Sequence, residues 1–361
     1  MRYGVGLGLV LIGGCADGAT PKQLPDPVWV PASPLANEPG RDLVWPDSTW
    51  QTTTPEAVGL SRKLVDSTVA MVGNRLPELR ALLVVIGGRI VVERYFRGAR
   101  PAEPVNTKSV TKSVLSALTG IALTQGVLDS LNAPVTKWLA ADIPDSADPR
   151  VGQLTVRHLL TMTGGFEWQE NGPITGEWMR SPNQVRFMLG TRMAASPGRE
   201  FNYSTGAVHL LAVALSRATG MDLAAYADTV LFGPIGVRPG SWGRDAQGHI
   251  EGGSELYLTP RDMARFGLLY LGRGRWKDRQ IVPEAWVLES TRPHGRVDYG
   301  YLWSYLPEEW GGPAINALGY GGQLISIVPD ANAVIVMASA IADPSNPILG
   351  ALRENLLPML R

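Results

Sequence analysis

Residues 106–113 read Asn-Thr-Lys-Ser-Val-Thr-Lys-Ser, and they open an amphipathic helix predicted over residues 109–125. Apolar side chains recur along one stripe of this helix at helical spacing: Val110, Val114, Leu118 and Ile121. Ser109 lies in the first turn, where unpaired backbone amides and the helix dipole favour an alkoxide or an oxyanion. Lys112 follows three residues later, so both side chains share one face of the helix.

This Ser-x-x-Lys spacing is suited to nucleophilic catalysis. Partial desolvation lowers the pKa of a lysine, which can then remove the proton of a neighbouring serine hydroxyl. The pattern occurs once in the chain, and no Gly-x-Ser-x-Gly sequence competes with it. The alternative interpretation is a helix-capping serine followed by a solvated lysine. His158 and His209 fall on predicted helices and are expected to be structural.

Composition restricts the classes of function. The chain has 361 residues, 45% of them hydrophobic, and its 33 basic residues balance its 33 acidic ones. A zero net charge argues against binding to nucleic acid or to an anionic membrane surface. One cysteine excludes an intrachain disulfide, and four histidines far apart in sequence argue against a His-rich metal centre. We therefore expect neither a metal nor another cofactor.

The N-terminus has the layout of an export signal. Arg2 precedes an apolar stretch over residues 4–14, and Ile12-Gly-Gly-Cys15 resembles a bacterial lipobox. We expect residues 1–15 to be a signal peptide and Cys15 to be lipidated; an ordinary signal peptide or a misassigned start remains the alternative. The Pro-rich residues 16–48 are predicted to form a tether. This interpretation places the protein in the periplasm or on the outer membrane, with membrane contact only through the lipid anchor.

The remaining pattern predicts an α/β (α+β) catalytic domain over residues 49–361. Gly87-Gly88 separates two β-rich runs at residues 81–86 and 89–94, which indicates a hairpin. Strand-like runs return near the other end of the chain, at residues 324–328 and 333–339. Helices are expected at residues 55–73, 109–125, 156–162, 184–189, 206–219, 223–230, 260–273, 283–291 and 345–357. We therefore predict one sheet built from both chain ends (about 49–104 and 241–361), a helical subdomain inserted between them (about 105–240), and an active site in the intervening cleft.

Several segments, in order, resemble one family. These are Ser109-Val-Thr-Lys-Ser-Val-Leu, Gly126-Val-Leu-Asp-Ser-Leu-Asn-Ala-Pro-Val, Leu154-Thr-Val-Arg-His-Leu-Leu-Thr-Met-Thr-Gly-Gly, Pro197-Gly-Arg-Glu-Phe-Asn-Tyr-Ser-Thr, Leu258-Thr-Pro-Arg-Asp-Met-Ala-Arg-Phe-Gly-Leu-Leu-Tyr and Gly319-Tyr-Gly-Gly-Gln. The chain resembles the serine hydrolases of the class C β-lactamase superfamily from about residue 50 onward. The block at 258–270, followed by Tyr299-Gly-Tyr-Leu-Trp, looks most like the branch of 6-aminohexanoate-dimer hydrolase and family VIII esterases. The resemblance implies a serine β-lactamase-like fold with an antiparallel sheet.

The resemblance also implies three catalytic elements, of which the third is the strand-edge sequence described below. Ser109 would be the nucleophile, and Lys112 would act with it. Tyr203, in place of the tyrosine of a Tyr-x-Asn motif, would be a general acid or base whose phenol pKa the nearby ammonium lowers. Thr205 replaces the asparagine, leaving a hydroxyl at a position that would contact substrate. Ser181-Pro-Asn183 also fits a Ser-x-Asn pattern and is expected to be a helix start instead.

A third element normally carries Lys-Thr-Gly or His-x-Gly, and here it reads Tyr320-Gly321-Gly322-Gln323. Its glycines allow the backbone to approach a substrate, and the amides of Gln323 and Ser109 would form an oxyanion hole. Tyr320 stands where a basic residue is usual. Trp178 is either a pocket wall or a packed tryptophan.

We therefore expect a serine hydrolase that cleaves small-molecule esters or small amides through an acyl-enzyme. One alternative is a D,D-peptidase or β-lactamase acting on peptidoglycan-like substrates. An alternative of another class is a non-catalytic binding lipoprotein with the same fold. Because Ser109, Lys112 and Tyr203 all stand in the chain, the non-catalytic alternative is disfavoured. The sequence does not predict the oligomeric state.

Overall fold

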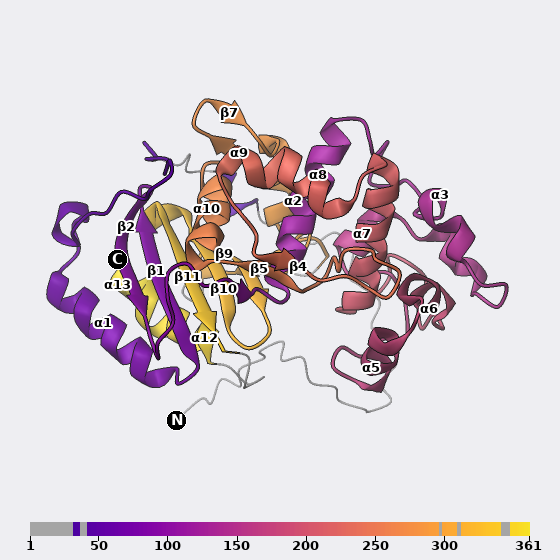
Figure 1. Cartoon of the computed structure of the whole chain (residues 1–361), viewed down its shortest axis with the longest axis horizontal. Coiled ribbons are helices and arrows are strands. Elements are labelled where there is room, and N and C mark those ends of the chain that lie inside the picture. The colour runs from indigo at the N-terminus through magenta and orange to yellow at the C-terminus, as the bar shows by residue number, and fades with distance from the viewer. Residues whose placement is uncertain (1–31, 37–41, 296–297, 309–311, 341–346) are drawn as a thin grey trace, which may run out of the picture.

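A six-stranded antiparallel sheet forms one half of the molecule (Figure 1). The computed structural model describes residues 32–36, 42–295, 298–308, 312–340 and 347–361. The strand order is β2-β1-β11-β10-β9-β8, so an N-terminal hairpin lies directly beside a C-terminal meander. The strands are β1 (Leu79–Ile86), β2 (Arg89–Tyr95), β8 (Ser304–Leu306), β9 (Ala314–Gly319), β10 (Gln323–Val328) and β11 (Ala333–Ser339). The predicted fold, a sheet built from both chain ends, is confirmed.

The β1–β2 hairpin follows from its sequence. Gly87 and Gly88 both have positive φ, +56° and +80°, which is the backbone of the tight turns that match strand twist. A side chain on Gly88 would collide with the Val44 carbonyl, 1.9 Å from the ideal Cβ position. β1 is apolar at successive positions because both of its faces are covered. Leu82 joins the core on one face of the sheet and Leu83 the core on the other.

Helices cover both faces of the sheet (Figure 1). On one face, α1 (Arg62–Arg75) packs with the C-terminal segment of α12 (Ile348–Ala351), a π-helical turn (Leu352–Leu356) and α13 (Leu357–Met359). On the other, α10 (Pro260–Leu271) packs against β1, β10 and β11, while α2 (Val110–Thr124) packs against β9 and β10. The first turn of α2 therefore lies beside the end of the sheet where β9 turns into β10.

A helical half is inserted between the two sheet segments. Its helices are α2, α3 (Thr136–Leu139), α4 (Val156–Leu160), α5 (Pro173–Arg180), α6 (Gln184–Gly190), α7 (Thr205–Thr219), α8 (Leu223–Ala227) and α9 (Gly233–Ile235), with a π-helical turn (Asp228–Phe232) between the last two. The buried helix α7 contacts α2, α3, α4, α6 and α8 and forms the centre of this half. A small sheet of β3 (Val105–Asn106), β5 (Leu256–Leu258) and β4 (Ser241–Trp242) closes the insertion. Helix α11 (Glu284–Thr291) and the β6 (Arg275–Trp276)–β7 (Arg279–Gln280) hairpin complete the set.

Part of the segment predicted to be a Pro-rich tether packs on the domain. The signal peptide and lipobox prediction at residues 1–15 lies outside the described residues, as do most of residues 16–41. However, Leu35 is completely buried, and the Ser33 hydroxyl bonds that of Thr291 at 2.7 Å. Further along, Trp45 packs on Trp276 with ring centroids 4.9 Å apart. Apolar side chains therefore dock residues 32–36 and 42–48 on the domain, which corrects this part of the predicted tether of residues 16–48.

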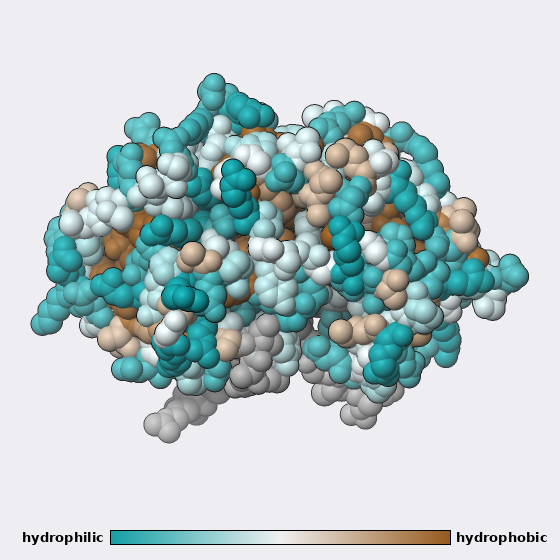
Figure 2. Space-filling view, in the orientation of Figure 1, coloured by the Kyte–Doolittle hydropathy of each residue, from teal (hydrophilic) through white to brown (hydrophobic). Residues whose placement is uncertain are grey.

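The face of the molecule drawn in Figure 2 is mostly hydrophilic or of intermediate hydropathy, and its hydrophobic residues lie mainly in recesses between polar ones. Within the described ranges, none of the helices combines the length and the apolar character needed to span a bilayer.

Candidate active site

The backbone at Ser109 is held by the hydrogen bonds of Thr107 before it and by helix α2 after it. The amide and the hydroxyl of Thr107 both donate to the Leu256 carbonyl at 2.8 Å, which ties the nucleophile segment to β5. Lys108 has a positive φ of +50°, an uncommon conformation for a residue with a side chain. Helix α2 then starts at Val110 with Ser109 as its N-cap, and the Ser109 amide has no hydrogen-bond acceptor among the described residues. The Ser109 hydroxyl and amide thus stand together at a helix N-terminus.

Lys112 is buried beside Ser109. Only 1% of the residue is exposed, and its ammonium group makes three hydrogen bonds. Nζ lies 2.9 Å from Ser109 Oγ, 3.0 Å from Thr205 Oγ1 and 2.7 Å from the Gly253 carbonyl oxygen. Burial lowers the pKa of Lys112 from 10.5 to about 8, although the negative charges of Glu170 and Glu251 oppose this change. The predicted lowering of the lysine pKa is confirmed.

Thr205, at the first position of α7, is held by a carboxylate. Its hydroxyl donates to Glu170 Oε1 at 2.5 Å and its amide to Glu170 Oε2 at 2.9 Å. The Trp168 indole donates to the same Oε2 at 2.7 Å and so orients the carboxylate. The Thr205 hydroxyl joins Lys112 to Glu170, and only 8% of the residue is exposed. Its role as a substrate contact stays a prediction.

Sequence reasoning missed Glu170 and Gly253. Glu170 comes from the loop before α5, 35 positions before Thr205, and no local motif marks it. The only signal for Gly253 was the Gly252-Gly253 pair. An ideal Cβ on Gly253 would lie 2.7 Å from Thr205 Cγ2 and 3.3 Å from Lys112 Nζ, so only glycine fits without displacement.

Tyr203 joins the same group of residues. Lys112 Nζ lies 5.0 Å from the centroid of its ring, and the Ser109 hydroxyl is close enough to the phenol to influence its pKa. The sequence interpretation expected the ammonium to lower the phenol pKa. The structure corrects this: burial of the hydroxyl, and then the charge of Glu170, raise the pKa of Tyr203, and the nearby Ser109 hydroxyl opposes them only in part. Tyr203 is therefore a protonated phenol at neutral pH.

The third element lies against the nucleophile segment. Tyr320, Gly321 and Gly322 form the turn between β9 and β10, and both glycines have positive φ, +74° and +93°. At the end of β9, an ideal Cβ on Gly319 would lie 2.3 Å from the Thr107 carbonyl oxygen, which shows how closely the two backbones approach. Tyr320 is 37% exposed.

Gln323 points its side chain away into the sheet. Its amide group donates to the Ser339 carbonyl at 2.7 Å and accepts from the Ser339 amide at 3.2 Å. The side chain is therefore fully engaged between β10 and β11, and only the backbone of Gln323 is available for the predicted oxyanion hole. That role remains a prediction.

Trp178 belongs to the core of the helical half. It is 2% exposed, and its ring makes edge contacts with Trp168 at 5.8 Å and His209 at 5.7 Å. Of the two alternatives for this residue, the structure favours the packed tryptophan. A buried ring between two other rings has no open surface to offer a substrate, so the pocket-wall assignment is corrected.

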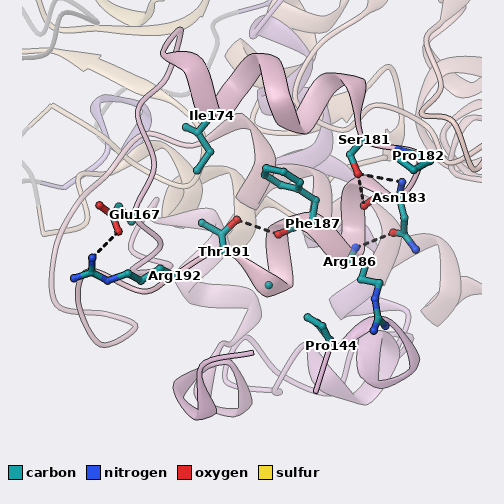
Figure 3. A pocket seen from close by; sticks show the side chains of 11 residues that line it. Pro144, Glu167, Ile174, Ser181, Pro182, Asn183, Arg186, Phe187, Thr191 and Arg192 are labelled. Atoms are coloured by element: carbon teal, nitrogen blue, oxygen red, sulfur yellow. Dashed lines mark hydrogen bonds and ion pairs between the residues drawn. The ribbon is translucent and has the colours of Figure 1, made fainter. Parts of the chain in front are cut away.

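A hollow of about 560 Å³ lies elsewhere, between α5 and α6 (Figure 3). Its lining includes Phe187 and Arg186 and contains none of Ser109, Lys112 and Tyr203. Ser181 and Asn183 border it, and Asn183 caps α6 by accepting from the Arg186 amide at 2.8 Å (Figure 3). Ser181-Pro-Asn183 is thus the helix start that was expected.

The arrangement of Ser109, Lys112 and Tyr203 invites comparison with known proteins. Residues 76–355 match the Beta-lactamase family. The chain belongs to the Beta-lactamase family. It is accordingly an enzyme, a serine hydrolase, and the predicted resemblance is confirmed.

Relatives in this family carry different activities. A 6-aminohexanoate-dimer hydrolase of Paenarthrobacter ureafaciens is 24% identical over 79% of this chain and 80% of its own. Esterase EstB of Burkholderia gladioli is 31% identical over 36% of each chain. A solved β-lactamase/D-alanine carboxypeptidase of Yersinia pestis is 19% identical and superposes with a TM-score of 0.65 over 83% of this chain and 98% of its own, which shows the shared fold.

Proposed function

We propose that the protein hydrolyses uncharged short-chain esters and small amides through an acyl-enzyme on Ser109. The observation behind this proposal is the set of three hydrogen-bond partners of Lys112 Nζ. The Gly253 carbonyl can only accept a hydrogen bond, and the Thr205 hydroxyl has its own hydrogen committed to Glu170. When Lys112 loses a proton, Ser109 is consequently the one partner that can donate to the new lone pair.

The proton of Ser109 would then pass to Lys112 as the oxygen attacks the substrate carbonyl. The Ser109 amide at the helix start, with the Gln323 backbone amide, would bind the oxyanion of the tetrahedral intermediate. Tyr203 is protonated at neutral pH, and although its raised pKa makes it a weak acid in the free enzyme, the ammonium formed on Lys112 beside it would favour the phenolate as it donates a proton to the leaving group. Water would attack the acyl-enzyme with the same residues acting in reverse, which returns the proton to Ser109.

The charges around the site favour an uncharged substrate. β-Lactams and D,D-peptides carry a carboxylate, which this family usually meets with a cation at the third element, where this chain has Tyr320. Lys108, next to the nucleophile, is already paired with Glu255 at 2.7 Å. Losing one charge-assisted contact costs about 1.5–3 kcal/mol, or roughly 10–150-fold in binding. The alternative function, a D,D-peptidase or β-lactamase, requires a cation from elsewhere in the chain.

A covalent probe tests the nucleophile. A fluorophosphonate should label one serine, and mass spectrometry of the digested adduct should locate it on Ser109. Ser109→Ala should lose both labelling and turnover. Ser181→Ala is the matched control, because this serine belongs to the competing Ser-x-Asn pattern and only borders the hollow of Figure 3. Labelling of any other residue would reject the proposal.

A substrate comparison tests the specificity. p-Nitrophenyl esters, linear amides, D-Ala-D-Ala peptides and a chromogenic cephalosporin should be assayed on one preparation, with Ser109→Ala as the blank. We expect the short esters to give the highest kcat/KM. A cephalosporin value equal to or above that of the best ester would favour the β-lactamase alternative instead.

A further inference from the structure

Two histidines that are far apart in sequence meet at one carboxylate behind the active site. His209 lies on α7, while Asp245 and His249 lie in a loop closed by a bridge between Arg244 and Ile250. Asp245 Oδ1 accepts the backbone amides of Gln247 and His249, at 2.9 and 2.8 Å, which fixes the carboxylate. Its other oxygen, Oδ2, lies 3.0 Å from His209 Nε2 and 2.9 Å from His249 Nδ1.

The His209 ring lies between two carboxylates. It is completely buried, and its Nδ1 atom has no hydrogen-bond partner among the described residues. The nearest acid to this atom is Glu251, with Oε2 at 4.0 Å. A neutral imidazole has one N–H and one lone pair. With the proton on Nε2, the Nδ1 lone pair faces Glu251; with the proton on Nδ1, the Nε2 lone pair faces Asp245.

A cation bound by both His209 Nε2 and Asp245 Oδ2 would give each of these atoms a partner. The lone pair of Nε2 would bind the cation, and the proton on Nδ1 would point to Glu251. This is the usual arrangement of a metal-bound histidine, whose second nitrogen donates to a carboxylate behind it. The ligand atoms of His209, Asp245 and His249 all lie within 4.8 Å of one another.

We propose that His209, Asp245 and His249 bind a zinc ion, with Glu251 orienting His209. Two imidazoles and one carboxylate, completed by water, are a recognised zinc ligand set. The His249 side chain is 23% exposed and gives the ion access from solvent, whereas His209 and the Asp245 side chain are buried. Binding displaces the proton of His249 Nδ1, which moves to solvent or to the outer nitrogen of the ring.

The zinc site is distinct from the acyl-transfer site. It joins the loop of residues 244–250 to α7, and α7 starts with Thr205. The same loop leads to Gly253, whose carbonyl accepts from Lys112. The ion would therefore stabilise the segment that carries two partners of Lys112 and would not contact the substrate. The sequence argued against a His-rich metal centre because the four histidines are dispersed, and the fold brings two of them together.

Zinc titration of the untagged, chelator-treated protein tests the proposal. Isothermal titration calorimetry should show one equivalent bound with a Kd below about 1 µM, and zinc should raise the Tm. His249→Gln, a change at the partly exposed ligand, should weaken binding by at least 100-fold. Glu251→Gln should weaken it by about 10–100-fold, the usual effect of losing a residue that orients a ligand.

His158→Gln is the matched control. His158 closes a capping box with Thr155, a role that glutamine also fills, so this variant should bind zinc like the wild type. The Tm of each variant without metal shows whether it folds. Absence of zinc binding by the wild type, or equal binding by folded His249→Gln, would overturn the proposal. Cobalt(II), used in place of zinc, should give visible absorption bands with the wild type. Retention of these bands in folded Asp245→Asn would also overturn the proposal.

Discussion

Replacing Glu170 by glutamine should change which hydroxyl bonds to Lys112. In the wild type, Thr205 gives its hydroxyl hydrogen to Glu170 at 2.5 Å and can only accept from Lys112. A glutamine can turn its NH₂ group toward Thr205 Oγ1 and keep its oxygen for the Thr205 amide. The Thr205 hydrogen is then released, and it competes with Ser109 for the lone pair of neutral Lys112.

The magnitude follows from the lost interaction. A hydrogen bond to a charged group contributes about 1.5–3 kcal/mol. When Thr205 can also donate to neutral Lys112, the population in which Ser109 donates to it should fall by roughly 10–150-fold, and kcat should fall with it. The charge of Glu170 also raises the pKa of Lys112, so Glu170→Gln should lower that pKa. Since the neutral lysine is the active form, the acidic limb of the rate profile should move to lower pH.

The assay is the pH dependence of kcat and kcat/KM for a short p-nitrophenyl ester. Glu167→Gln is the matched control, because this carboxylate lies in the same loop, is 58% exposed and pairs only loosely with Arg192 at 3.4 Å. It should leave both kcat and the profile unchanged. A Glu170→Gln enzyme with wild-type kcat would refute the role of Thr205 described above. A reduced kcat with an unmoved acidic limb would show a purely structural effect.

Three further predictions follow from the geometry around Lys112, and a fourth follows from the N-terminal sequence. The wild-type kcat/KM should rise with pH with an apparent pKa of about 8, because Lys112 must lose its proton, so activity at pH 7 should be roughly a tenth of the plateau; a flat profile from pH 6 to 9 would contradict this. Tyr203→Phe should lower kcat by about 100-fold or more while the protein stays folded, as judged by its Tm, and full activity would remove the tyrosine from the mechanism. Gly253→Ala should lower kcat by at least about tenfold by pushing Thr205 and Lys112 apart, whereas Gly152→Ala, with nothing within 4 Å of its added methyl, should not. Cys15→Ser should release the protein from the membrane fraction or block its processing, and an uncleaved N-terminus on cytoplasmic protein would reject the lipoprotein prediction.

Local patterns predicted much of the framework. The Gly87-Gly88 hairpin depends on turn chemistry and β-rich runs, and the α2 helix depends on its apolar stripe, so both are visible in short windows of sequence. β9 was not predicted, because the buried polar residue Asn316 interrupts its apolar run. α5 was also missed, since its start at Pro173 lies in a Gly- and Pro-containing stretch that reads as a loop.

The site was predictable only where its residues are neighbours in sequence or belong to a family motif. Ser109 and Lys112 share a helix turn, but the partners that limit Lys112 to one donor come from distant loops. Burial, and then the charge of Glu170, account for the wrong direction of the Tyr203 pKa, because neither effect can be assessed before the fold brings these groups together. Similarly, His209 and His249 meet only after α7 packs against the loop at Asp245.

The docked segment around Leu35 and Trp45 limits how far the enzyme can act from a membrane. If Cys15 is the anchored residue, the docked part of the chain is reached by Ser33 at the latest, since the Ser33 hydroxyl is bonded to Thr291. A fully extended chain covers about 3.3–3.6 Å per residue, so the stretch from Cys15 to Ser33 spans at most roughly 65 Å. The catalytic serine would then sample a shallow layer above the bilayer, and substrates would have to diffuse into that layer to be hydrolysed.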